Sequence, residues 1–275
     1  MKIHKLLTAS ALFVTCTAGA FLSGTAQGAV SSTTGDLILA FRSNNNTTAI
    51  NLEVDLGPAT SFLSVPAGQT IQLNLGGAYY GSTGGLSDKD LQIQYGDGST
   101  DSSWNSRSDL VWSVAGTNGA AGGDTLYATF PGSASSRAAQ ATQATPANRI
   151  VTEYSTLSGQ SSLTSPQAAA ISSSQSGSYS VQIRNGNPGT FTKDYNYFSP
   201  TTETGVVSSG TATSAFYALP AGSGAATDLG TFALGSNGTF TYTAAAVPEP
   251  STFAAIGLGA GILLLARRRA SLKNA

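Results

Sequence analysis

The chain has 275 residues and a formal net charge of -1, and only 10% of its residues are charged, against roughly a quarter in an ordinary globular protein. It has one histidine, one cysteine and one methionine, all within the first sixteen residues, at His4, Cys16 and Met1. Removal of that stretch as an export signal would leave a mature chain with none of the three. This excludes a Ser-His-Asp triad, a cysteine nucleophile, a disulfide and a His or Cys zinc site, and we predict no cofactor.

The N-terminal segment has the three parts of a secretory signal peptide. Lys2 and Lys5 precede an apolar run over residues 6–22, and small residues follow up to Ala29. A positive start, a short apolar centre and a small-residue exit are typical of a cleaved export signal. We therefore expect residues 1–29 to be a signal helix that is removed on export; a retained N-terminal membrane helix is the alternative.

Alternation of apolar and polar residues dominates the segment from residue 30 to residue 246. Leu52, Val54 and Leu56 alternate with polar residues, which predicts a strand with one buried and one hydrated face. The run Leu37–Phe41 is apolar throughout, as expected of a strand covered on both faces. The alternating pattern predicts further strands over residues 71–75, 91–95 and 179–183.

A different pattern occupies residues 137–175. Thr145 and Pro146 have the form of a helix N-cap and first turn, and apolar residues then recur at helical spacing as far as Leu157. Ser-Pro at 165–166 repeats this start before residues 167–171. We therefore predict a small helical insertion between two β-rich parts.

Asn237-Gly238 lies between two runs of strand-forming residues, 231–234 and 239–243. Asn-Gly in this setting is a strong hairpin signal. Many short strands joined by Gly-, Asn- and Ser-rich turns predict a mainly β exported domain over residues 30–246, an antiparallel, sandwich-like fold.

The C-terminal region joins a Pro-Glu-Pro tripeptide to an apolar segment and an arginine cluster. As a helix, residues 253–266 would span about 21 Å, and flanking residues with snorkelling arginines bring the segment, about 252–266, close to the roughly 30 Å of a bilayer core. The basic end is then cytoplasmic, with the bulk of the chain outside. A plain tail anchor is the alternative. The residues that carry this pattern are Val247, Pro248, Glu249, Pro250, Arg267, Arg268 and Arg269.

This tail resembles the PEP-CTERM sorting domain of Gram-negative bacteria, over residues 247–275. The resemblance implies that Pro248, Glu249 and Pro250 form the recognition site of a membrane-embedded exosortase, which cuts near them, and that the arginines are the stop. It also implies an inner-membrane intermediate, anchored by a C-terminal transmembrane helix, followed by the cell surface or extracellular matrix of a bacterium that makes exopolysaccharide. In this relationship the chain is a substrate of the exosortase and of the export machinery.

The segment between the two ends is acidic. It holds seven basic and thirteen acidic residues, so its net charge is near -6. Such a surface lacks the basic footprint of a nucleic-acid-binding protein, and we predict no nucleic-acid partner.

Two groups of residues between the ends are candidates for a binding site. Exposed rings of Tyr79, Tyr80, Trp104 and Trp112 would suit the apolar face of a sugar, and the alternative is that they fill the core. Asp97 and Asp101 flank a Gly-Ser-Thr turn that offers oxygen ligands to calcium. A pair of carboxylates from this region would also be enough for a glycoside hydrolase, an enzyme class that needs no histidine. The alternative is that they are solvated loop charges.

Our interpretation is a non-enzymatic exported protein of the cell surface or extracellular matrix, with a structural or adhesive role. The alternative is a carbohydrate-binding module of the exopolysaccharide matrix, and a carboxylate-based glycoside hydrolase is the third hypothesis.

Overall fold

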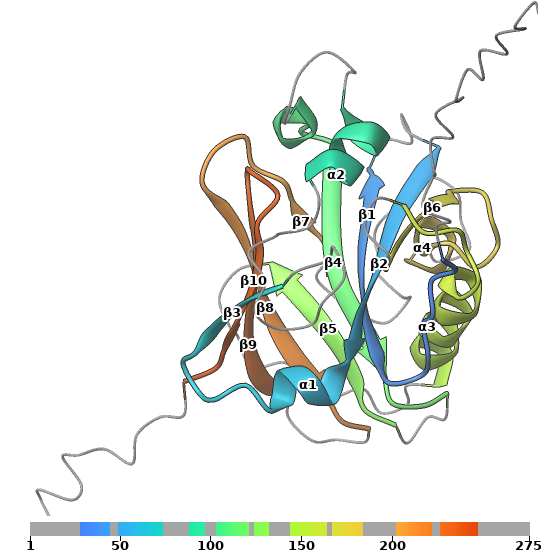
Figure 1. Ribbon diagram of the computed structural model, residues 1–275. Coiled ribbons are helices and arrows are strands. Elements are labelled where there is room, and N and C mark those ends of the chain that lie inside the picture. Colours follow the sequence, from blue (N-terminus) through green and yellow to red (C-terminus); the bar gives the residue numbers. More distant parts are fainter. Residues whose placement is uncertain are drawn as a thin grey trace, which may run out of the picture.

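The computed structural model of the chain is shown in Figure 1. It describes residues 28–44, 49–73, 88–96, 103–120, 124–131, 144–163, 167–183, 202–221 and 226–246. The expected signal segment up to residue 27 and the tail from Val247 onward lie outside these ranges. No helix within the ranges is long and apolar enough to cross a membrane.

The described residues form one curled antiparallel sheet of ten strands, which confirms the mainly β, sandwich-like prediction. The strand order is β3-β10-β9-β8-β5-β4-β1-β2-β6, and β7 pairs with β4. The strands are β1 (Asp36–Ser43), β2 (Ile50–Pro58), β3 (Thr70–Leu73), β4 (Leu110–Thr117), β5 (Leu126–Pro131), β6 (Ala168–Ser172), β7 (Thr204–Gly205), β8 (Thr211–Leu219), β9 (Thr227–Gly235) and β10 (Phe240–Ala244). The helices are α1 (Ala59–Leu63), α2 (Asp88–Tyr95), α3 (Ala144–Leu157), α4 (Tyr179–Ile183) and the 3-10 turn η1 (Ser103–Ser106).

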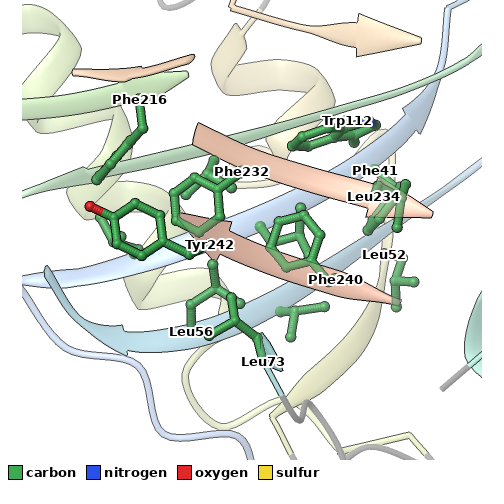
Figure 2. Close-up of a cluster of buried hydrophobic side chains, with 14 of the residues drawn as sticks. Phe41, Leu52, Leu56, Leu73, Trp112, Phe216, Phe232, Leu234, Phe240 and Tyr242 are labelled. Carbon is green, nitrogen blue, oxygen red and sulfur yellow. The ribbon is translucent and has the colours of Figure 1, made fainter. Parts of the chain in front are cut away.

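An aromatic core fills the inside of the curl (Figure 2). Leu39 of β1 lies in the same buried cluster as Phe232 of β9 and Tyr242 of β10, although β1 and β10 are far apart in the strand order. The ring centroids of Phe232 and Tyr242 are 5.0 Å apart, and those of Trp112 and Phe240 are 5.6 Å apart. Because full burial of such a side chain contributes roughly 1.5–3 kcal/mol, this core stabilises the curl of the sheet.

Helices α3 and α4 cover the outer face of the sheet (Figure 1). Ile38 and Ala40 of β1 belong to a second buried cluster, together with Ile150 and Tyr154 of α3 and Tyr179 of α4. All eight residues of β1 are consequently buried, which confirms the prediction of a strand covered on both faces.

The prediction that one face of β2 is hydrated is wrong, because α4 covers that face. Asn51 and Glu53 are fully buried and Asp55 is 6% exposed. Alternation reports only that two faces differ in polarity, and here the polar face meets polar partners in the protein instead of water.

Residues 91–95 are not a strand but part of α2. Leu91 and Tyr95 are both buried, whereas Ile93 between them is 60% exposed. Leu91 and Tyr95, at positions i and i+4, lie on one face of a strand and also on one face of a helix, so that over five residues only the exposed Ile93 separates the two structures.

Residues 179–183 are likewise helical and form α4, with Tyr179 and Ile183 buried one turn apart. The helix expected over residues 167–171 is wrong as well, because this segment forms β6. There Ala169 pairs with Glu53 and Ile171 with Asn51 in an antiparallel ladder, so tertiary pairing overrides the local preference of an alanine run.

Two local predictions are confirmed. Helix α3 starts at Ala144, beside the expected Thr-Pro start, and ends at Leu157. Strands β9 and β10 form the expected hairpin, with Phe240 opposite Leu234. Gly238 adopts a φ of 80° in its turn, a conformation that favours glycine.

Gly230 of β9 is a position where any side chain should be costly. Its φ is 139°, and a Cβ there would lie 2.1 Å from the backbone oxygen of Thr243 in β10. We expect Gly230→Ala to lower the free energy of unfolding by about 1–3 kcal/mol, measured by urea titration. Gly210→Ala is the control: its φ is 79°, but its Cβ would meet no atom within 4 Å. Equal losses in the two variants would show that contact with β10 has no part in the effect.

Candidate functional site

The two tryptophans proposed for sugar stacking belong to the core. Trp104 and Trp112 are both 0% exposed, and the Trp112 ring packs edge-on against Phe240. Neither indole is open to a ligand in this fold, so the core alternative holds for both. Tyr79 and Tyr80 lie outside the described residues.

The carboxylates proposed for calcium, Asp97 and Asp101, also lie outside the described residues. Of their neighbours, Asp90 is 1% exposed, and Asp109 accepts hydrogen bonds from Arg107 Nη2 at 2.6 Å and Ser43 Oγ at 2.6 Å. Within the part of the chain that the structure describes, no three His, Cys, Asp or Glu side chains are placed to hold a metal ion together.

The most polar interior site is an ion pair under α4. Arg42 of β1 is fully buried and binds Glu203 in a bidentate manner, with Nε 2.5 Å from Oε1 and Nη2 in contact with Oε2. The Tyr179 hydroxyl donates to the same Oε1 at 3.0 Å and lies 2.5 Å from Ser113 Oγ. Two strands, one helix and the segment before β7 therefore meet at one guanidinium–carboxylate pair.

Polar residues of β2 hold the other side of α4. Glu53 Oε1 accepts a hydrogen bond from the backbone N–H of Tyr179 at 2.7 Å, at the start of the helix, where N–H groups lack partners inside the helix. Ser180 Oγ donates to Asn51 Oδ1 at 2.6 Å. These contacts explain why a strand that alternates apolar and polar residues is buried on both faces.

Burial changes the acidity of two of these carboxyl groups. It raises the pKa of Glu53 to about 8, against the opposing effect of the Tyr179 N–H. Burial, reinforced by the negative charge of Asp36, raises the pKa of Asp55 to about 7. Both groups are therefore largely protonated in the folded domain under mildly acidic conditions. Glu53 contacts α4 through the Tyr179 N–H, whereas Asp55 Oδ1 accepts the Gly57 N–H of its own strand at 2.7 Å.

Tyr154 attaches α3 to the sheet. Its hydroxyl donates to the Asp36 backbone oxygen at 2.6 Å and accepts from the Thr117 N–H at 2.8 Å. We expect Tyr154→Phe to lower the free energy of unfolding by about 1–3 kcal/mol, since buried backbone groups lose their partner. Thermal and urea unfolding followed by circular dichroism measures the loss. Tyr127→Phe, which alters a buried tyrosine away from α3, should change stability by less than half as much, and a loss as large as that of Tyr154→Phe would argue against the hydrogen-bond explanation.

A groove of about 410 Å³ lies where the described chain ends, between α1, the start of β9 and the end of β10. Its wall is mainly apolar. The lining residues are Phe62, Leu63, Val65, Ala67, Asp228, Leu229, Tyr242, Ala244, Ala245 and Ala246.

Backbone hydrogen bonds fix the chain up to this groove. The Ala244 N–H donates to Gln69 O at 3.0 Å, and Ala244 O accepts from the Gly68 N–H at 3.1 Å. The Ala245 N–H donates to Leu229 O at 3.0 Å. The described chain ends one residue later, at Ala246, and Pro248 of the Pro-Glu-Pro segment is two positions further along the sequence.

The described β domain therefore reaches to within two residues of the Pro-Glu-Pro segment along the sequence. Residues 246–269 match the family model of the PEP-CTERM protein-sorting motif. The chain thus carries a PEP-CTERM sorting motif, which supports export and processing by an exosortase through a membrane-anchored intermediate. Comparisons with curated proteins and with solved structures gave no match.

Of the motif residues 246–269, Ala246 is described by the structure, and the rest, from Val247 to Arg269, lie outside the described residues. Their order and spacing along the sequence are enough to identify them. The interior site of Arg42, Glu203 and Glu53 is not predictable in this way, since its one local sign is a charged residue at the end of an apolar strand.

Proposed function

We propose that the mature domain is a non-enzymatic structural or adhesive component of the cell surface or extracellular matrix, delivered there by its sorting tail. The observation that carries this proposal is the motif at residues 246–269 on a domain whose buried charges attach its own layers to one another. A protein that is exported and released as a closed domain is suited to a role as a passive building unit.

The test follows the full-length protein in its native host with an antibody against the domain. In the parent strain, the processed form should be found at the cell surface or in the matrix. In a strain lacking the exosortase, the unprocessed form should accumulate in the inner membrane. Unprocessed protein confined to the cytoplasm of the parent strain would contradict the proposal, and so would release of reducing sugar from the host polysaccharide by the purified protein.

We propose binding of matrix polysaccharide as the second candidate, on account of a polar groove of about 430 Å³ between η1 and the segment after β7. Asn105, Arg107 and Ser208 are among its lining residues, and amide, guanidinium and hydroxyl groups are suited to sugar hydroxyls. Calorimetry with host polysaccharide tests this site. Arg107→Gln should weaken binding about tenfold, the loss typical of one charged hydrogen bond, and Arg149→Gln, outside the groove, should leave it unchanged. Equal binding by both variants and the original protein would exclude this groove.

A further inference from the structure

The cleavage region follows the folded domain at very short range. Among the described residues, Ala245 is the last one with a backbone hydrogen bond to the sheet, and Pro248 is three residues further along the sequence. Three residues extend at most about 11 Å. An enzyme that holds the Pro-Glu-Pro segment in its active site therefore also contacts the surface of the domain around Ala245.

The surface at that point is the apolar groove between α1 and β10. Leu63 on its rim is 47% exposed, and Phe62 and Tyr242 pack edge-on in its wall with ring centroids 5.4 Å apart. The polar groups nearby already have partners: the Tyr242 hydroxyl donates to Leu229 O at 2.5 Å, and Asp228 Oδ1 accepts from the Gly230 N–H at 2.9 Å. The groove therefore offers an apolar surface to its occupant.

We propose that this groove is a docking surface for the exosortase, which inserts an apolar side chain beside the peptide it cuts. The inference rests on the sorting function above. A recessed site fits a protruding protein side chain better than it fits a flat bilayer surface. Because the cleavage segment starts within about 11 Å of the groove, both contacts can form in one complex.

The chain provides a matched control for the groove. Leu63 and Ile93 are exposed large apolar residues, at 47% and 60%, and they lie on α1 and α2, at opposite ends of the sheet in Figure 1. Each is replaced by aspartate in the full-length protein, and processing is followed by pulse-chase in the host. Leu63→Asp should slow cleavage about tenfold, because it places a charge against the apolar side chain that enters the groove, whereas Ile93→Asp should leave the rate unchanged. Equal rates for Leu63→Asp and the original protein would overturn the proposal.

A spacer separates docking from other causes. A twelve-residue Gly-Ser insertion after Ala246 frees the cleavage segment from the groove, so Leu63→Asp should then cost less than twofold. A tenfold loss that persists with the spacer would point to impaired export and would overturn the proposal. Equal cleavage of all variants by exosortase in detergent, with Leu63→Asp slow only in membranes, would assign the groove to lipid and would also overturn it. Absence of cleavage in the original protein would instead refute the sorting function.

Discussion

Glu203→Gln is expected to lower the free energy of unfolding by about 3–5 kcal/mol, because it removes the carboxylate opposite a buried guanidinium. Arg42 is 0% exposed and lies on β1, which is paired on both sides by β4 and β2, so water cannot reach its charge without disrupting the packed structure. Urea titration of the purified domain region measures the loss. The variant should also unfold at a lower temperature.

Two further variants define the cause. The double variant Arg42→Met, Glu203→Leu removes both charges and should be more stable than Glu203→Gln, since an apolar pair of similar volume often replaces a buried ion pair without loss. Asp109→Asn weakens a more exposed ion pair, that of Asp109 with Arg107, in which the side chain of Arg107 is 22% exposed and that of Asp109 is 17% exposed. This variant should lower the free energy of unfolding by about 1 kcal/mol. A double variant that is less stable than Glu203→Gln would show that the interior requires these charges themselves.

Stability should fall as the pH rises from 4 to 8. The pKa values of Glu53 and Asp55 are about 8 and about 7 in the folded domain, against ordinary values of 4.5 and 3.8 for these side chains in water. Between these limits the folded state holds protons that the unfolded state has released, so each added unit of pH costs up to about 1.4 kcal/mol per group. We expect a total loss of several kcal/mol between pH 4 and pH 8, and the contribution of these two groups should level off only above about pH 9, where Glu53 is ionised in both states.

Glu53→Gln tests this assignment directly. The amide oxygen can still accept the Tyr179 N–H, but the side chain no longer titrates. Its stability curve between pH 5 and pH 8 should have about half the slope of the original protein, and the variant should be the more stable of the two at pH 8. Parallel curves for both proteins would exclude Glu53 as a source of the pH dependence.

The sequence predicted local structure correctly where a single residue pair fixes a turn, or where a long stretch of helical spacing fixes a helix. Asn237-Gly238 is enough for a tight turn, and the spacing from Ile150 to Leu157 is enough for one face of α3. Segments of five residues were assigned wrongly, because α2, α4 and β6 take their conformation from what they pack against. The tail at residues 246–269 could be found because its function depends on order along the chain.

The interior site could not be found in this way. Arg42 and Glu203 are 161 positions apart, and their pairing depends on the curl of the sheet. The same curl buries Trp112, and the predicted role of this residue in sugar binding required an exposed ring. The sequence alone does not show which polar strand face will be buried between the sheet and its helices.

The two terminal strands of the sheet, β3 and β6, have four and five residues. A long, flat edge would offer unpaired backbone groups to a neighbouring copy, and short edges limit such strand addition. Crowded copies of the domain should therefore remain discrete units and resist growth into fibrils. Association between them would then depend on side-chain surfaces such as the two grooves, which sequence variation can alter without disturbing the sheet.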